Sequence, residues 1–220
     1  NWSGWKIEAA WKLDRKVYPK LEYKVQYDES DFDFMARIVA EAGICFTFPD
    51  DNKEGSKLTF WDALHENKPR KEHLQFVDNP GESSEKDYIA HVQLYYQVNP
   101  GAFVIRDFDF RNPKFALTGQ AKKELDPEGK YEIFDYRAGA FLSEVKEGGK
   151  ATPVADKKGV ARYDPTFGQA LAERSLAAER ADNRTLDFSS NCLDLWPGVV
   201  FHMDDHPHSQ LDEKAKLLVT

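Results

Sequence analysis

Residues 21–48 read LEYKVQYDESDFDFMARIVAEAGICFTF and contain the pattern that decides the fold. Apolar and polar residues alternate over 21–27, a period of two that predicts a strand. Ser30 is a favourable N-cap, and the apolar residues after it recur at spacings of three and four, which predicts an amphipathic helix. Gly43 suits the left-handed residue that ends a helix. Alternation then returns over 44–48, so the stretch predicts a strand–helix–strand unit.

Strand patterns dominate the remaining sequence. A second helix is expected from Asp164 as N-cap, with Pro165 in its first position, to about Asn183. The run 131–136 has aromatic residues on both faces and is expected to be buried on both sides, whereas 139–160 is expected to be an exposed loop. Alternating patterns bounded by turn residues predict further strands at 57–61, 74–77, 88–96, 103–110, 114–123, 185–193, 199–203 and 217–219. Short connections favour antiparallel pairing, so the predicted class is α+β, mainly β, with two helices.

Composition excludes several classes of protein. The formal net charge of −8 over 220 residues argues against a nucleic-acid-binding surface. No apolar run approaches the roughly 18 residues of a membrane span, and the first residues lack signal-peptide character. Two cysteines are too few for a disulfide scaffold, and Cys45 is expected to be a small packed strand residue. We therefore expect synthesis in the cytoplasm. The missing initial Met and the strand-like end KLLVT predict a piece of a longer protein.

The densest group of potential metal ligands lies near the end of the chain. His202, His206 and His208 alternate with Asp204 and Asp205, and this set could hold Zn²⁺ if the chain turned suitably. The segment also reads as the end of a strand entering a polar turn, and no separate Glu/His motif completes a ligand set. The turn interpretation is favoured, so no metal site is predicted.

Asp107 and Asp109 share one side of a predicted strand and could form a paired-carboxylate acid–base site. A solvent-facing strand edge explains them better, because no partner group or cleft is visible. Neither Cys45 nor Cys192 has an identifiable base at a meaningful spacing. Nucleophile-elbow, P-loop and dinucleotide motifs are missing from the sequence. We therefore expect no catalytic residues, no cofactor and no enzymatic activity.

Four segments resemble the VgrG spike proteins of type VI secretion, which share their hub fold with contractile-phage tail hubs. They occur in the family's order: YDESDFDFMARIVAEAGICFTF (27–48), VNPGAFVIRDFDFRNP (98–113), YEIFDYRAGAF (131–141) and ALAERSLAAERADNRTLDFSSNCLDLWPGVVFHMDDHPHSQL (170–211). Two local turns depart from the pattern. Residues 137–139 stand where Pro-Gly is expected, and Asp204-Asp205 stands where a Gly is common.

The resemblance implies a phage tail hub-like fold with barrel-like antiparallel sheets. It implies a strand–helix–strand hub subdomain over 1–97 and a β-rich, barrel-like hub subdomain with one helix over 98–220. The implied function is that of a structural subunit, a homotrimer that docks on the Hcp tube with baseplate proteins and carries effectors out by type VI secretion. Some strand aromatics, such as Tyr95 and Phe134, are then expected between subunits.

Two alternatives stay open. A phage or phage-like contractile tail hub would share the same fold and the same segments. A carbohydrate-binding module or a metal hydrolase is a different class; the first would need solvent-facing aromatics grouped in a groove, and the second would need a bound metal.

Overall fold

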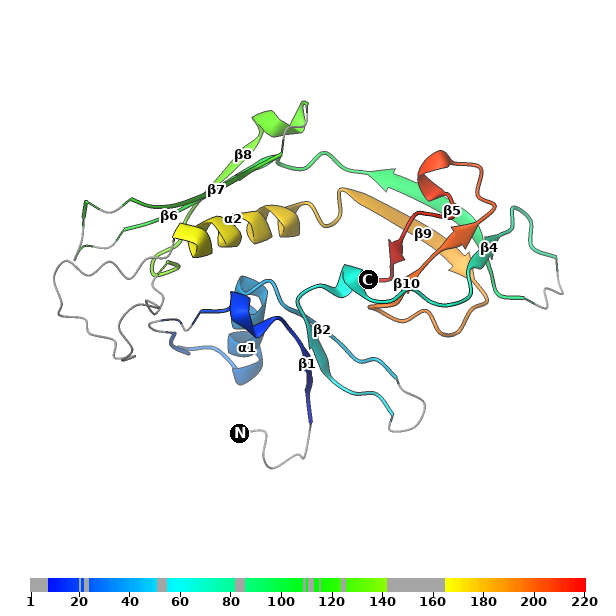
Figure 1. Ribbon diagram of the computed structural model, residues 1–220, viewed down its shortest axis with the longest axis horizontal. Helices are drawn as coiled ribbons and strands as arrows, with labels where there is room; N and C mark the ends of the chain where they lie inside the picture. The colour runs from blue at the N-terminus through cyan, green and yellow to red at the C-terminus, as the bar shows by residue number, and fades with distance from the viewer. Residues whose placement is uncertain are drawn as a thin grey trace. The chain divides into compact units, whose positions relative to one another are not determined.

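The computed structural model describes residues 8–19, 21, 24–50, 55–81, 86–108, 110, 113–114, 116–123, 126–141 and 165–220 (Figure 1). The chain divides into two compact units, and each is discontinuous in sequence. Unit 1 comprises Asn1–Leu13, Ile44–Tyr95 and Thr185–Thr220, and unit 2 comprises Asp14–Gly43 and Tyr96–Arg184. The chain therefore crosses between the units several times.

Unit 1 is built mainly from short strands. Its sheets have the orders β1-β3-β2, β11-β4-β5-β9 and β10-β12. The four-stranded sheet pairs strands of the segment Ile44–Tyr95 with strands of the segment Thr185–Thr220, so it depends on segments that are far apart in the sequence. The elements are β1 (Ala10–Lys12), β2 (Cys45–Thr47), β3 (Thr59–Trp61), η3 (Leu64–Glu66), β4 (Leu74–Phe76), β5 (Tyr88–Tyr96), β9 (Arg184–Ser190), β10 (Val200–Phe201), β11 (Met203–Asp204), η5 (Ser209–Leu211) and β12 (Leu217–Leu218).

The core of unit 1 forms around the four-stranded sheet. Its fully buried side chains come from β4, β5, β10, β11 and η5, and Phe188 packs edge-on against Phe201 at a centroid distance of 5.7 Å. The buried members are Leu74, Ile89, Cys192, Phe201, Met203 and Leu211. Burying side chains of this size supplies roughly 1.5–3 kcal/mol each, which is the main favourable term for the unit.

Strand β5 contains an irregularity at its fourth residue. His91 has φ 55°, in the left-handed region that favours glycine, and its side chain is exposed. Ile89 belongs to the unit 1 core and Val92 packs against it, although the two residues are three positions apart and regular alternation would place them on opposite faces. A left-handed residue inside a strand shifts the alternation in this way, as in a β-bulge. The His91 backbone therefore lets both halves of β5 present apolar side chains to one core.

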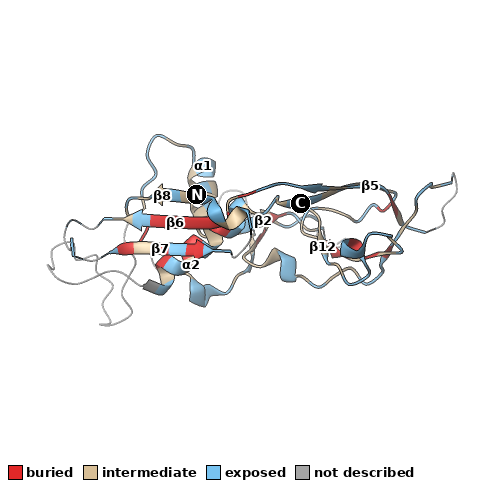
Figure 2. Cartoon of the chain, turned by 90° about the horizontal axis from the view of Figure 1, so that it is seen from above, coloured by how far each residue is buried: buried red, intermediate tan, exposed pale blue. Residues whose placement is uncertain are grey.

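Unit 2 contains a three-stranded sheet of order β7-β6-β8, with a helix against one face (Figure 1). Its elements are η2 (Arg15–Val17), α1 (Asp31–Glu41), β6 (Ala102–Asp107), β7 (Leu117–Lys122), η4 (Glu128–Lys130), β8 (Glu132–Tyr136) and α2 (Pro165–Glu179). The buried core comes from β6, β7 and α2 with Ala140 and Phe141. Central strand β6 is almost wholly buried, whereas β8 is mostly exposed (Figure 2).

Helix α2 approaches β7 at two glycines. A Cβ on Gly119 would lie 2.0 Å from the backbone oxygen of Gly168, so the strand and helix backbones touch. This close approach lets Leu171, Ala172 and Leu176 of α2 reach the sheet. Only glycine at position 119 is compatible with it.

Helix α1 begins and ends at the predicted residues. The hydroxyl of Ser30 accepts from the backbone N–H of Asp33 at 3.1 Å, and Gly43 follows the C-cap with φ 71°. Lys24 pairs with Glu41 at 2.5 Å, which ties the preceding segment to the helix. The apolar stripe of α1 is half-buried rather than buried. In the described parts of the chain, no helix has both the length and the apolar character needed to cross a bilayer.

The α+β class with dominant strands and two helices is confirmed, but several details differ. The sheets are mixed rather than antiparallel and barrel-like, because β1 pairs parallel to β3, β11 to β4, β4 to β5, and β6 to β8. Strands that are far apart in the sequence pair in these sheets, so the length of the connections does not determine whether a pair is parallel or antiparallel. The predicted split into 1–97 and 98–220 lies close to the crossing at Tyr95–Tyr96, but a single cut does not separate units that each recur along the chain.

Three local predictions were wrong. The described residues of 21–27 form no strand beyond an isolated bridge at Leu21. The run 131–136 lies at a sheet edge with one aromatic face exposed, instead of being buried on both sides. Within the predicted loop 139–160, Ala140 and Phe141 are core residues; its part from 142 onward, like Asp164, lies outside the described residues.

Candidate functional site

An ion-pair cluster in unit 1 joins three separate segments. Arg70, whose side chain is 15% exposed, donates through Nη2 to Oδ2 of Asp87 at 2.7 Å and through Nε to Oδ2 of Asp194 at 3.1 Å. Its backbone N–H donates to the carbonyl of Val200 at 2.7 Å. One guanidinium therefore fastens the start of β5 and the loop after β9 to the segment before β4.

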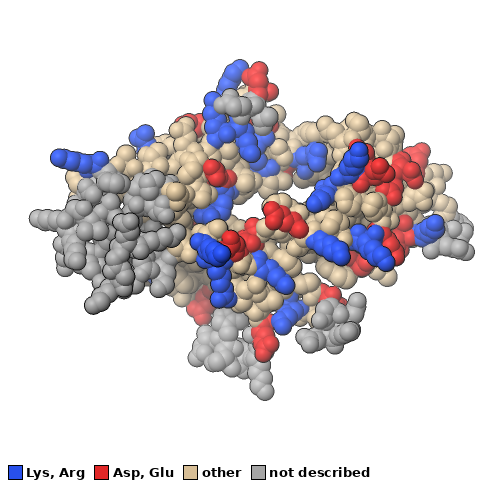
Figure 3. Space-filling view, viewed as in Figure 1, with Lys and Arg blue, Asp and Glu red and all other residues tan. Residues whose placement is uncertain are grey.

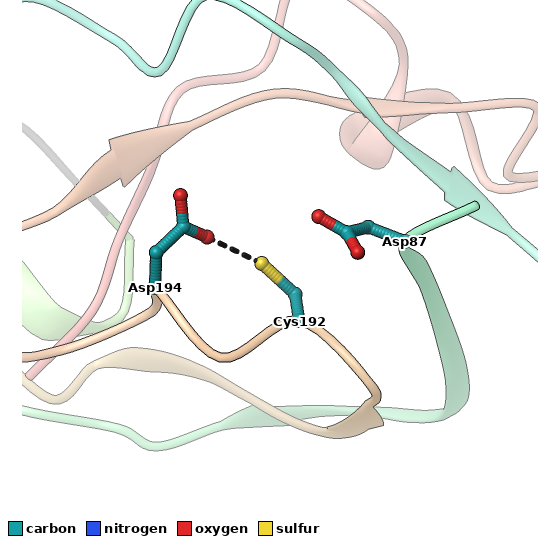
Figure 4. A group of neighbouring side chains, drawn as sticks. All are labelled: Asp87, Cys192 and Asp194. Atoms are coloured by element: carbon teal, nitrogen blue, oxygen red, sulfur yellow. Dashed lines mark hydrogen bonds between the residues drawn. The ribbon is translucent and has the colours of Figure 1, made fainter. Parts of the chain in front are cut away.

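Cys192 completes this cluster (Figure 4). Its Sγ donates to Oδ1 of Asp194 at 2.6 Å, and burial, followed by this hydrogen bond, raises the pKa of the Cys192 thiol to about 11. The hydrogen bonds from Cys192 and then Arg70 hold the pKa of Asp194 below its usual range. The thiol is therefore protonated at neutral pH, and the carboxylate is charged.

The ligand atoms of Asp87, Cys192 and Asp194 lie within 4.8 Å of one another, which is close enough to share a metal ion. The electrostatics favour a different role. A divalent cation would have to displace the guanidinium of Arg70 from both carboxylates and remove the thiol proton, and ligand thiols must be deprotonated. The geometry therefore suits a structural ion-pair cluster better than a metal site. This cluster of Arg70, Asp87, Cys192 and Asp194 is here called the Arg70 clasp.

The three histidines near the end of the chain contact different neighbouring groups. His202 Nδ1 lies 3.0 Å from the carbonyl oxygen of Ala215, and its ring packs on His73 at a centroid distance of 4.9 Å. The ring of His206 packs edge-on against Phe76, and His208 Nδ1 accepts from the backbone of Gln210 at the start of η5.

The neighbouring carboxylates also have other partners. Asp204 Oδ1 lies 2.8 Å from Nδ1 of His73, and Asp205 Oδ2 accepts from Gln75 at 3.3 Å. Asp205 has φ 63°, the conformation that favours glycine, at the position where the family resemblance leads one to expect a Gly. His202 and Asp204 both contact His73, and the backbone N–H of His208 donates to His206 Nδ1 at 3.1 Å. The five candidate ligands thus bond to neighbouring protein groups, and they do not form a group of close ligand atoms in the described residues.

The remaining residues considered as possible site residues are Asp107, Asp109 and Cys45. Asp107 Oδ1 accepts from the backbone N–H of Phe108 at 2.7 Å, and its Oδ2 is buried without a hydrogen-bond partner. Asp109 lies outside the described residues. Cys45 was expected to be packed but is exposed, and its Sγ lies 3.6 Å from the Trp61 carbonyl oxygen.

Exposed aromatic side chains make unit 2 suitable for assembly. Tyr131, Phe134 and Tyr136, on or beside β8, are between 52% and 58% exposed. Tyr95 of β5 is 47% exposed, so the two aromatics expected between subunits are both accessible in the isolated chain. On the face seen in Figure 3, basic and acidic side chains are interspersed over the described surface, as is usual for a surface without nucleic-acid contacts.

Comparison with known proteins identifies the family. Residues 1–220, the whole chain, match the model of the phage tail baseplate hub (GPD) family. The chain belongs to this family. The hub is also 26% identical over 197 residues to the type VI secretion system spike protein VgrG4b of Pseudomonas aeruginosa, covering 89% of this chain and 22% of that protein. It is 28% identical over 211 residues to VgrG1c of the same organism, covering 93% and 25%. The resemblance to VgrG spikes is thus confirmed, and the chain spans a quarter or less of these relatives.

One further sequence relative and one solved structure also resemble this chain. The actin cross-linking toxin VgrG1 of Vibrio cholerae is 28% identical over 116 residues, which cover 52% of this chain and 10% of the toxin. The crystal structure of the 43 kDa tail protein of prophage MuSo2 from Shewanella oneidensis aligns with a TM-score of 0.54 at 12% identity. That alignment covers 99% of this chain and 56% of the tail protein, and it shows a common fold.

Sequence reasoning missed the Arg70 clasp of the hub. The partners of Arg70 lie 17 and 124 positions away in the sequence, so no local pattern around Arg70 indicates them. The Cys-x-Asp spacing of Cys192 and Asp194 was the one local signal, since a thiol and a carboxylate two positions apart in a turn can form a hydrogen bond.

Proposed function

We propose that this hub is part of a type VI secretion spike in which it acts as a structural subunit. Three copies form a closed ring, the ring docks on the tube of Hcp protein, and the assembly leaves the cell with its effectors. The protein is made in the cytoplasm and meets baseplate proteins there. No residue carries out chemistry in this role.

The observation that carries the proposal is the family match over the whole chain, joined by spike relatives aligned over about nine-tenths of it. The described structure agrees with a mechanical role. Two strand-rich units share the chain through several crossings, and an ion-pair cluster and close backbone contacts fix their internal geometry.

A contractile-phage tail hub is the second candidate. It is supported by the family description and by the common fold with the MuSo2 tail protein. The two candidates differ in the tube protein that the ring receives, so the tube protein separates them.

The test is a binding experiment with the full-length protein that contains this chain. We would present it with the Hcp protein and the phage-type tail tube protein encoded in the same genome, and recover complexes by affinity tag. Retention of Hcp alone supports the spike. Retention of the phage-type tube protein alone identifies a phage tail hub, and retention of neither contradicts both proposals.

A further inference from the structure

Strand β8 lies at an edge of the unit 2 sheet. The order in the described residues is β7-β6-β8, so β8 has β6 as its strand neighbour. The carbonyl of Tyr131 accepts from the N–H of Ala102, on the β6 side. Because backbone direction alternates along a strand, the N–H and C=O groups of Glu132, Phe134 and Tyr136 point away from β6. An edge of this kind is a template for another strand, and β8 (EIFDY) carries neither the proline nor the lysine that commonly protects one.

The side chains of the same three edge residues lie on the sheet face opposite α2. Ile133 packs against the core beneath α2, and successive side chains of a strand alternate between the faces. Phe134 and Tyr136 are 58% and 57% exposed, and Glu132 is also exposed. In chain order, this edge therefore presents an acidic side chain followed by two aromatic ones.

Strand β1 lies at an edge of a sheet in unit 1. The order in the described residues is β1-β3-β2, so β1 has β3 as its strand neighbour. The N–H of Ala10 donates to the carbonyl of Leu58 at 2.9 Å, on the β3 side. By alternation, the backbone groups of Trp11 and Leu13 point away from β3.

The side chains of the β1 edge also have a distinct order. Trp11 stacks on Phe60 with ring centroids 4.5 Å apart, yet 53% of its side chain is exposed. After Leu13 the backbone stays extended at Asp14 (φ −79°, ψ 93°) and reaches Arg15, the exposed first residue of η2. In chain order, this edge therefore presents an aromatic, an aliphatic and a basic side chain at alternate positions.

An antiparallel ladder between the two edges matches these side chains one by one. The pairs are Trp11 with Tyr136, Leu13 with Phe134, and Arg15 with Glu132. Aromatic pairs, apolar pairs and opposite charges are the cross-strand pairs that stabilise a sheet. The edge of β1 is thus complementary to the edge of β8 in both charge and apolar character.

Other alignments of the two edges match less well. Moving the antiparallel ladder by two residues in one direction places Arg15 opposite Lys130, a like charge, and moving it in the other direction separates Arg15 from Glu132. A parallel ladder brings the alternate side chains of β1 onto this face, and those of Lys12 and Asp14 are charged. The antiparallel alignment alone joins the ion pair to two apolar pairs.

We propose that the β8 edge of unit 2 receives the β1 edge of a second copy of this chain, with Glu132 opposite Arg15 of the next copy. This inference rests on the proposed function and specifies the contact between copies. Because the two edges differ, the contact is heterologous and repeats around a ring. Main-chain hydrogen bonds supply affinity, and the ion pair and the exposed aromatics set the register.

Charge reversal tests the pairing in the full-length protein. Arg15→Glu and Glu132→Arg each place like charges opposite one another at every junction of the ring, so each should weaken assembly by about tenfold or more. The double variant restores opposite charges and should recover assembly to within about threefold of wild type. Lys214→Glu is the matched control, because it makes the same charge change at an exposed position outside both edges. Mass photometry over a concentration series measures the assembly, and thermal melting of each variant shows that the fold is intact.

A cross-linking experiment gives a readout independent of affinity. Directly opposed residues of an antiparallel pair have Cα atoms about 5.5 Å apart at most, which is within the reach of a disulfide. Leu13→Cys and Phe134→Cys are placed on separate, differently tagged chains that are expressed together, both with Cys45→Ser because Cys45 is exposed. A disulfide between these positions then joins different copies, and mild oxidation should give covalent heterodimers. The matched control replaces Leu13→Cys by Tyr27→Cys, since Tyr27 is 86% exposed.

The outcomes separate this inference from the hub proposal. Recovery in the double charge variant, with heterodimers above the control, supports the β1–β8 contact. Rings that form but ignore the charge changes, fail to recover in the double variant, or cross-link no better than the control overturn the contact and leave the hub standing. A wild-type full-length protein that forms no ring and binds no tube overturns both.

Discussion

Arg180 donates through Nη2 to Oε2 of Glu128 at 2.7 Å, and the pair is largely shielded, with side chains 10% and 17% exposed. Nη1 of Arg180 also donates to the carbonyls of Asn99 and Pro100, while Glu128 Oε1 accepts from the Asn99 backbone. The end of α2, the turn before β6 and the helix η4 thus meet at one ion pair. Glu128 and Arg180 lie 29 and 81 positions from Asn99, so no local sequence pattern could predict that they meet this turn.

This pair predicts a pH dependence. The hydrogen bond from Arg180 holds the pKa of Glu128 below its ordinary value of 4.5. A lowered folded-state pKa stabilises the fold above the unfolded-state pKa, and this contribution disappears as the pH falls through the folded-state pKa. Glu128→Gln should therefore be less stable than wild type at pH 7, and the difference should shrink below about pH 4. Thermal melts from pH 3 to 7 measure it; a constant difference over that range would contradict the assignment.

The contact between Gly119 and Gly168 predicts a steric effect. Gly119→Ala places a methyl group 2.0 Å from a backbone oxygen that belongs to a helix, so α2 or β7 must move. We expect a loss of about 3 kcal/mol or more in the free energy of unfolding. Gly81→Ala is the matched control, because nothing lies within 4 Å of its Cβ position. Urea denaturation of both variants checks this, and equal stabilities would show that the close approach is not structural.

The left-handed conformation of His91 predicts that the relative stability of Gly and Val variants is opposite at two positions of one strand. At position 91, Gly should be more stable than Val by about 1–2 kcal/mol, because φ 55° strains a β-branched residue. At exposed Gln93, two positions along β5, Val should be more stable than Gly, because a regular strand favours Val. Chemical denaturation of the four variants supplies the comparison. The same order at both positions would mean that β5 is regular.

The Cys192 thiol should resist alkylation. Its pKa of about 11 exceeds the ordinary value of 9.0, so the folded state holds the proton more tightly than the unfolded state. The resulting stabilisation is complete below about pH 9 and is lost as the pH rises toward 11. Iodoacetamide at pH 8 should modify Cys192 of the folded protein far more slowly than exposed Cys45. Arg70→Met should speed the labelling of Cys192 relative to Cys45, because it loosens the loop that holds Cys192. Peptide mass spectrometry measures both sites; rapid labelling of Cys192 would contradict the burial and hydrogen bonding described.

The features that could be predicted from the sequence are those that depend on interactions between residues close together in the chain. Helix α1 was predicted from Ser30 and Gly43 because caps act within a few residues. Strand β5 was predicted at its observed bounds because alternation is local, although the shift at His91 left no clear signal. The predicted strand at 21–27 was wrong because alternation alone does not provide a partner strand.

Features that depend on contacts between distant segments could not be predicted from the sequence. Phe134 and Tyr136 were assigned to a doubly buried strand because their pattern does not say whether the strand is central or at an edge. Sheet order decides that, and it places β8 at an edge. The clasp around Arg70 and the discontinuous units likewise depend on which distant segments meet. Whole-chain resemblance to the spike family carried the functional reading where local patterns could not.

The mass of the assembly shows whether this chain is the hub of a spike ring. Native mass spectrometry of the full-length protein at micromolar concentration, alone and with Hcp, measures it. We expect three subunits per particle and addition of an Hcp ring to that particle. A protein that stays monomeric at all concentrations and adds no Hcp would contradict it.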